Sequence, residues 1–167
     1  MTLAIRAMRD ADAPQVVAMV RGLARDTGAG LVPRLAPESL IANRDLIDVT
    51  VAEDEKGLMG ACLALLTYST WRDARGLYVV DLFVHARARN GGVGLELLRE
   101  AARRGRARGA RFIKLEVDRA NAGAERFYER LGFVRNDKDR IFVLEDGKVT
   151  EFLAAGRAPA SGRGGVL

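Results

Sequence analysis

The spacing of apolar side chains along the first two thirds of the chain predicts three helices. Apolar residues at i, i+3, i+4 and i+7 predict a helix over residues 13–26, and Asp10 or Asp12 stands where its cap belongs. A shorter helix is predicted over residues 37–43, and a long one over residues 92–108. The segments between these helices have a different period.

Runs that alternate between apolar and polar residues, or that are apolar throughout, predict six strands. They cover residues 3–8, 48–53, 58–68, 77–84, 111–117 and 140–144. Residues 77–84 are apolar on both parities, which is typical of a central strand covered on two faces. Residues 146–154 fit either a strand or a short helix. The order of elements predicts an α/β fold with a mixed sheet.

Composition supports a single folded domain. Of the 167 residues, 49% are hydrophobic and 29% are charged, which is ordinary for a soluble protein. We expect one domain over residues 1–154 and a disordered tail over residues 155–167, which are rich in Gly, Pro and Arg. The longest apolar run is too short to span a bilayer, and the first residues have no signal-peptide core. A cytoplasmic protein that binds no membrane is therefore predicted.

Charged and metal-ligating residues exclude several functions. One cysteine, Cys62, and one histidine, His85, permit no internal disulfide and make a metal site unexpected. A net charge of +5 favours an anionic partner. The arginines of residues 99–108 have no interleaved aromatic residues, so we interpret them as a solvated helix face and expect no nucleic acid to bind there.

The sequence "RNGGVG", residues 89–94, indicates where the anion binds. Glycine lets a ligand approach the main chain, and the first amides of a helix attract phosphate. A dinucleotide-binding fingerprint would need a third glycine, where the chain has Leu97, and a P-loop would need Gly-Lys-Ser/Thr. Neither of those motifs is present, so the stretch is a phosphate-binding loop of another kind or a tight connection.

Two motifs together resemble the GNAT acyltransferases. Arg89-x-x-Gly92-x-Gly94, between an apolar strand and a helix, is similar to the pyrophosphate-binding motif of that superfamily. Residues 121–133, "NAGAERFYERLGF", are similar to its later stretch, in which an Asn caps a helix that carries Phe-Tyr and ends in Leu-Gly-Phe. Residues 68–94 also resemble the diamine and polyamine (spermidine/spermine-type) acetyltransferase branch, in a Tyr-x-Thr/Ser-x-Trp loop and in the strand "DLFV".

The resemblance implies the GNAT acyltransferase fold, a mixed central sheet flanked by helices on both faces, and acetyl-CoA as co-substrate. It also implies roles for named residues. Backbone groups of Phe83 and Val84 would contact the pantetheine arm. Asn121 would contact that arm or cap the helix that shapes its exit, and Phe127 in that helix would also bind the cofactor. Tyr128 would protonate the departing thiolate. The diphosphate would be held by Arg89, Asn90, Gly91, Gly92, Val93 and Gly94.

The general base is not assigned by the resemblance, because Val80 stands where the polyamine branch has a glutamate. Asp81 is the nearest acid, and its pKa would be raised if the strand is buried. A buried acid paired with an arginine or amide is an equally good interpretation of Asp81. Glu116 is another possible base or substrate anchor, whereas His85 at the end of the strand is expected to be exposed.

The function that we predict is transfer of acetyl from acetyl-CoA to a small diamine, polyamine or amino-acid-like amine, in a ternary complex without metal. Tyr68 and Trp71 would line the acceptor pocket or pack its loop. A protein N-terminal or lysine acetyltransferase, a non-catalytic acetyl-CoA-binding module and an arginine-rich nucleic-acid binder are the alternatives. A homodimer is expected because the branch commonly forms one.

Overall fold

The chain divides into two compact units, Met1–Arg126 and Phe127–Leu167. The structure, a computed structural model, describes residues 3–28, 30 and 32–154. The predicted disordered tail lies outside the described residues, and a single domain over residues 1–154 stays a prediction. Within the described residues, no helix combines the length and the apolar character that crossing a membrane requires.

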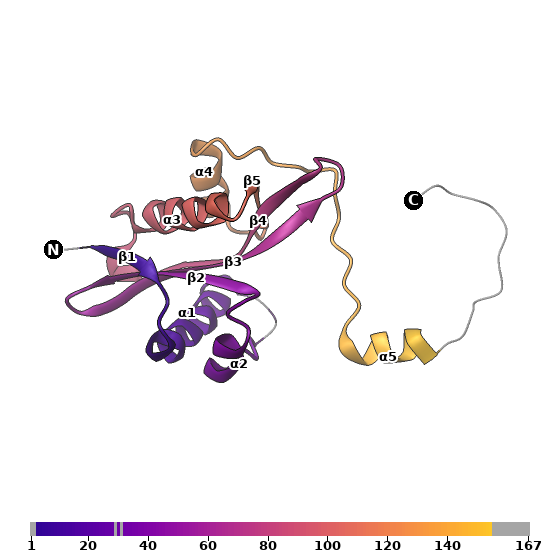
Figure 1. Ribbon diagram of the computed structural model, residues 1–167, viewed down its shortest axis with the longest axis horizontal. Coiled ribbons are helices and arrows are strands. Elements are labelled where there is room, and N and C mark those ends of the chain that lie inside the picture. The colour runs from indigo at the N-terminus through magenta and orange to yellow at the C-terminus, as the bar shows by residue number, and fades with distance from the viewer. Residues whose placement is uncertain (1–2, 29, 31, 155–167) are drawn as a thin grey trace. The chain divides into compact units, whose positions relative to one another are not determined.

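A five-stranded sheet forms the centre of the first unit (Figure 1), with the strands in chain order. The first four strands run antiparallel and the fifth lies parallel to the fourth, so the sheet is mixed as predicted. Its strands are β1 (Ala4–Ala7), β2 (Ile47–Asp54), β3 (Gly57–Ser69), β4 (Ala74–Val84) and β5 (Ala110–Leu115).

Helices cover both faces of this sheet, which confirms the predicted fold class. The helices α1 (Ala13–Asp26) and α2 (Pro37–Ala42) lie on one face, and α3 (Val93–Ala107) lies on the other (Figure 1). Short 3-10 turns, η1 (Asp10–Asp12) and η2 (Ala86–Ala88), precede α1 and follow β4. The helix α4 (Ala122–Arg130) follows β5.

Close packing at two glycines fixes α1 and α3 against the sheet. A Cβ at Gly22 of α1 would lie 3.3 Å from the Phe83 ring, and one at Gly105 of α3 would lie 3.1 Å from Leu77. Phe83 and Leu77 are both nearly fully buried, and burial of side chains of this size contributes about 1.5–3 kcal/mol each. The β4 strand is thus covered on both faces, as its sequence predicts.

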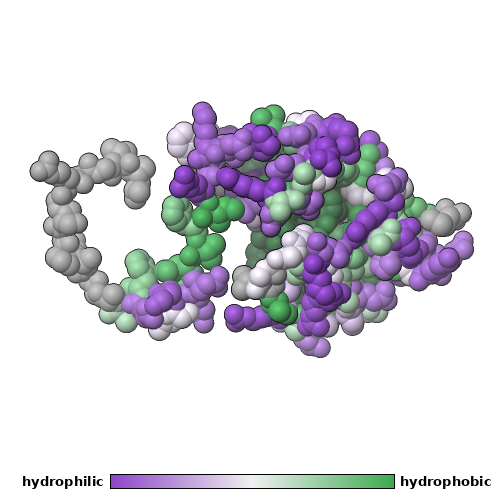
Figure 2. Space-filling model, turned by 180° about the vertical axis from the view of Figure 1, so that it is seen from behind, coloured by the Kyte–Doolittle hydropathy of each residue, from purple (hydrophilic) through white to green (hydrophobic). Residues whose placement is uncertain are grey.

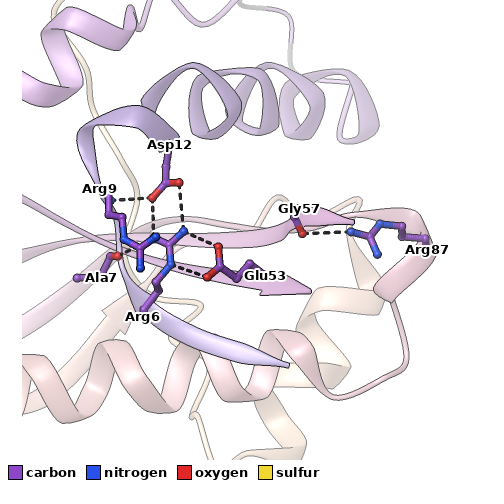
Figure 3. Close-up of polar contacts among 7 residues, drawn as sticks. All are labelled: Arg6, Ala7, Arg9, Asp12, Glu53, Gly57 and Arg87. Atoms are coloured by element: carbon purple, nitrogen blue, oxygen red, sulfur yellow. Dashed lines mark hydrogen bonds and ion pairs between the residues drawn. The ribbon is translucent and has the colours of Figure 1, made fainter. Parts of the chain in front are cut away.

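An arginine links the first strand to its neighbours. Arg6 donates to both oxygens of Glu53 on β2 and to both oxygens of Asp12 in η1 (Figure 3). The bound guanidinium lowers the pKa of both carboxyl groups. Asp12 also accepts from the Arg9 amide at 2.7 Å, so it does not cap α1 with its side chain as predicted, and its carboxylate serves the turn before the helix instead.

The second unit corrects one predicted strand and decides one open choice. Residues 140–144 are not a strand, because no other strand is present among the described residues of this unit to pair with them, and an isolated strand is unstable in water. Phe142 is 90% exposed. Residues 146–154 were open to either structure, and they form α5 (Asp146–Ala154).

Candidate active site

The β4 strand carries a bulge where its pairing with β5 ends. Leu63 of β3 lies opposite Asp81, whereas its neighbour Ala64 lies opposite Val79, so Val80 is an extra residue in β4. Pairing between β4 and β5 ends at Val79 and Leu115. From Val80 onward, the β5 side of β4 has no strand partner in the described part of the chain, and this edge is open to a ligand.

Main-chain groups of β4 point alternately toward β3 and toward this open edge. The amide of His85 donates to the Met59 carbonyl of β3 at 2.8 Å. Alternate residues of a strand direct their main-chain groups to the same side, so Phe83 also faces β3, and Leu82 and Val84 face the open edge. Leu82 is a residue that the motif did not identify, because the direction follows from strand register.

The loop after β4 presents unpaired amides at the start of α3. Asn90 and Gly92 both have left-handed backbones, with φ of 63° and 78°. Gly92 is the N-cap of α3, where no side chain caps the helix. The amides of Gly92, Val93, Gly94 and Leu95 find no acceptor among the described residues, so the loop offers four donors at the positive pole of a helix. This arrangement fits a diphosphate.

Arg87 anchors the beginning of this loop to the turn between β2 and β3. Its guanidinium donates to Asp54 at 2.5 and 3.0 Å and to the Gly57 carbonyl at 3.3 Å (Figure 3 shows the contact with Gly57). The Asp54 side chain is 2% exposed. Hydrogen bonding between the two groups raises the pKa of Arg87 and lowers that of Asp54. The motif gave no indication of this anchor.

Arg89 lies between β4, α1 and the loop. Its Nε donates to the Val84 carbonyl at 3.0 Å, and its Nη2 forms an ion pair with Asp26, the last residue of α1. Both side chains of the pair are 49% exposed. Arg89, which is predicted to bind phosphate, therefore precedes the unpaired amides in the chain and already has an acidic partner.

Asp81 lies beside the bulge, on the α1 face of the sheet. Its opposite residue, Leu63, belongs to the core cluster that packs against α1, and directly opposed residues share a face. Its carboxylate has no hydrogen bond or ion pair to any described residue, and burial raises its pKa. The alternative of an acid paired with an arginine or an amide is not observed.

Tyr78, in the middle of β4, lies near both Asp81 and Glu116, the residue that follows β5. Burial, together with the charge of the Glu116 carboxylate and a hydrogen bond to it, raises the pKa of Tyr78. Glu116 is exposed and pairs with Lys114 at 3.6 Å, and the Lys114 ammonium lies 5.7 Å from the centre of the Tyr78 ring. Glu116 follows β5, which ends at Leu115, and its function as a base or substrate anchor stays a prediction.

The residues of the second motif lie in and after α4. Asn121 caps α4, because its Oδ1 accepts from the Ala124 amide at 3.0 Å. In the second unit, the ring of Tyr128 makes edge contacts with Phe127 at 5.1 Å and with Phe133 at 5.4 Å. The capping function of Asn121 is confirmed, and the catalytic function of Tyr128 stays a prediction.

Other polar and aromatic residues have simpler environments. His85 is exposed, as predicted, and accepts from the Arg87 amide at 3.4 Å. Tyr68 bonds to Asp73 within the β3–β4 hairpin, and Trp71 at its tip is 98% exposed, and neither residue lines the groove between α3 and β5. Burial raises the pKa of Cys62 to about 12, which makes it an inert core thiol.

The arginine-rich face of α3 is partly neutralised. Arg99 pairs with Glu96 at 2.7 Å, and Arg104 donates to Asp48 at 3.0 Å. A shallow groove of about 450 Å³ lies between α3 and β5. It has an apolar floor and an arginine rim, with Leu77, Arg99, Ala102, Arg103, Arg106, Ala110, Arg111, Phe112 and Ile113 as its lining. Hydrophilic residues cover much of the visible face of the first unit (Figure 2).

Comparison with known families agrees with the geometry of the loop and the open edge. The sequence model of the acetyltransferase (GNAT) family matches residues 15–133. The chain belongs to the GNAT family. Members of this family use acetyl-CoA as the acetyl donor. The matched range contains the bulge of β4, the loop with its free amides and the capped helix α4.

A curated acetyltransferase is similar to part of this GNAT chain. Streptothricin acetyltransferase of Streptomyces lavendulae is 40% identical over 73 residues, which cover 44% of this chain and 38% of that protein. The match thus spans well under half of that relative. No membership of the polyamine branch follows from it.

Solved structures share the fold of this GNAT chain at low identity. An integron cassette protein from the mobile metagenome of V. cholerae has a TM-score of 0.73 and 17% identity, covering 92% of this chain and 98% of that one. An aminoglycoside acetyltransferase from an uncultured soil metagenomic sample, solved in complex with sisomicin, has a TM-score of 0.70 and 17% identity over 84% and 94% of the two chains.

Proposed function

We propose that the protein transfers the acetyl group of acetyl-CoA to a primary amine of a small molecule. The observation that carries this proposal is the row of four unpaired amides at the start of α3, next to the edge of β4 that β5 leaves open. Phosphate needs donors of this kind, and an extended thiol arm needs a strand edge to pair with. Acetyl-CoA supplies the activated acetyl thioester when it is bound.

The loop and the strand edge divide the work of binding. Arg89 and the loop amides of residues 90–94 hold the diphosphate, and the left-handed Asn90 and Gly92 turn the chain so that successive amides converge. Val84, with Phe83 before it, takes the pantetheine arm along β4, and we add Leu82 because its main-chain groups face the open edge. Asn121 and Phe127 are our candidates for further contacts with the arm.

Removal of a proton from the acceptor is the energetic problem that the site must solve. An amine with a pKa of ~10.4 costs about 4.6 kcal/mol to neutralise at pH 7. Asp81 is our candidate for the base, because it is partly buried, lacks a partner among the described residues and has a raised pKa. Tyr128 is our candidate for the general acid that protonates the sulfur. Val80 has no proton to exchange.

The acceptor that we propose is a small diamine, polyamine or amino-acid-like amine. Asp81 and Glu116 supply carboxylates on this part of the sheet for a cationic molecule, against an overall charge of +5 that would repel it at long range. The names of the relatives, streptothricin acetyltransferase and an aminoglycoside acetyltransferase in complex with sisomicin, support a small cationic substrate. We also propose a homodimer, which sedimentation would test.

Release of free thiol from acetyl-CoA tests this function. The assay uses diamines, polyamines, aminoglycosides, streptothricin, amino acids and short peptides as acceptors. We expect turnover with the small cationic amines, loss of most activity in Tyr128→Phe, and little change in the control Tyr68→Phe, whose hydroxyl lies on the exposed hairpin. Turnover with peptides alone would overturn the choice of acceptor.

The pH dependence of the rate tests the base. If Asp81 accepts the proton, kcat/KM rises with pH through its raised pKa, and Asp81→Asn removes this limb. Asp10→Asn serves as the control, because it removes a carboxylate from an exposed pair with Arg44 outside the site. Tight binding of acetyl-CoA with no turnover of any amine would instead identify a non-catalytic binding module.

A further inference from the structure

The ion pair between Arg89 and Asp26 joins the loop after β4 to the end of α1. Arg89 donates through Nε to the Val84 carbonyl, and Asp26 accepts from the other end of the same guanidinium. The two side chains are half exposed and come from positions 63 residues apart. A carboxylate therefore lies against the cation that the proposed diphosphate site uses.

Among the residues that the structure describes, the Asp26 side chain forms no hydrogen bond with its own helix. It is the last residue of α1, where the free carbonyls form the negative pole and an acidic side chain is unfavourable. Its side chain pairs with Arg89. Asp10 differs, because it lies in η1 before the start of α1, where a negative charge is favourable, and pairs with Arg44.

A diphosphate and the Asp26 carboxylate are both anions, and both need the same guanidinium. They repel each other at short range, and the planar guanidinium presents only one outer edge once Nε is bound to Val84. Binding of the diphosphate therefore either displaces Asp26 or takes place against its charge. In both cases the carboxylate lowers the affinity for the phosphate-bearing ligand.

We propose that Asp26 is an affinity-setting residue, an internal anion that occupies Arg89 until the diphosphate of acetyl-CoA displaces it. This proposal rests on the proposed function, since it requires the loop to bind that diphosphate. Asp26 acts through Arg89 and does not contact the reacting atoms. The displacement also links occupancy of the loop to the end of α1.

Titration calorimetry of the whole chain with CoA, and separately with inorganic pyrophosphate, tests the proposal at low ionic strength. We expect Asp26→Asn to bind both ligands more tightly, by about two- to fivefold, as suits the loss of one exposed ion pair. Asp10→Asn removes the same charge from another exposed pair and should leave the affinity unchanged. Higher salt should reduce the gain.

A double-mutant cycle with Arg89→Ala isolates the contact from general charge effects. Asp26→Asn should tighten CoA binding clearly in the parent and much less in the Arg89→Ala background. If Asp26→Asn binds CoA as tightly as the parent or more weakly, the proposal is overturned. Binding of CoA by the parent still supports the proposed function in that case. Absence of CoA binding by both the parent and Asp26→Asn overturns both, and unchanged circular dichroism shows that each variant is folded.

Discussion

Two arginines on one loop, Arg87 and Arg89, are separated by a single alanine and have different partners. Arg87 pairs with Asp54, whose side chain is 2% exposed, and also donates to a carbonyl of the β2–β3 turn. Arg89 pairs with Asp26, which is 49% exposed at the end of a helix. The same residue type in the same short loop therefore performs two kinds of work.

The difference teaches which cation is available to a ligand. Removing Arg87 from Asp54 would leave a buried carboxylate without its guanidinium, and such a loss is costly. Removing Arg89 from Asp26 exposes both charges to water at small cost, because exposed pairs contribute little. We infer that Arg87 holds the loop in place and that Arg89 is free to exchange its partner for phosphate.

Arg89→Ala is the change with the largest expected effect. A hydrogen bond to a charged group contributes about 1.5–3 kcal/mol, so the Kd for acetyl-CoA should rise by about 10- to 100-fold. Thermal stability should hardly change. Calorimetric titration and a melting curve measure the two quantities on the same sample. Arg89→Lys, which keeps the charge and loses the fork, should fall between the parent and Arg89→Ala.

Arg87→Ala should show the opposite balance. Its Tm should fall by about 2–4 °C, since Asp54 loses its partner, while acetyl-CoA binding weakens less than in Arg89→Ala. The double variant Arg87→Ala/Asp54→Ala should recover part of the lost stability, because it removes the unpaired carboxylate. Arg44→Ala, from an exposed pair, is the matched control. If Arg44→Ala and Arg87→Ala melt alike, Arg87 is no anchor.

Gly92→Ala tests the backbone between the two contacts and the helix. Gly92 has a φ of 78° and open space around its Cβ position, so strain rather than a clash opposes the change. We expect a loss of ~1 kcal/mol in the free energy of unfolding, measured with urea. Gly91→Ala is the control, because its φ is not left-handed and its nearest contact, at 3.4 Å, is ordinary. Equal losses in both variants would contradict the argument.

Local sequence patterns predicted most of the first unit. The predicted helix over residues 13–26 matches α1, because the apolar stripe and the proline near its start are properties of the segment itself. The predicted strand at residues 140–144 had an equally apolar sequence and was wrong. A strand needs a hydrogen-bonding partner elsewhere in the chain, and that partner is not visible in the pattern of one segment.

The candidate site divides in the same way. Gly92 and the helix after it could be predicted, because a left-handed residue before a helix is a local requirement. The pair of Arg87 with Asp54 joins residues 33 positions apart and depends on the β2–β3 turn reaching the loop. The extra residue Val80 depends on the register between β3 and β4. Such features follow from the assembled sheet and not from a motif.

The smallest expected effect is on the pH dependence of stability, and it tests the anchoring pair of Arg87 with Asp54. Hydrogen bonding to Arg87 holds the pKa of Asp54 below its ordinary value of 3.8, so its contribution is fully present above that value. The contribution is lost as the pH falls through the lowered pKa.

The difference in Tm between the parent and Asp54→Asn should therefore be constant from about pH 5 to pH 7 and should narrow below about pH 4. Asp12 and Glu53 also have lowered pKa values, but the parent and Asp54→Asn both retain these two residues. The difference in Tm between the two proteins therefore reports on Asp54. A difference that widens on acidification would show that the folded protein does not favour the charged form of Asp54.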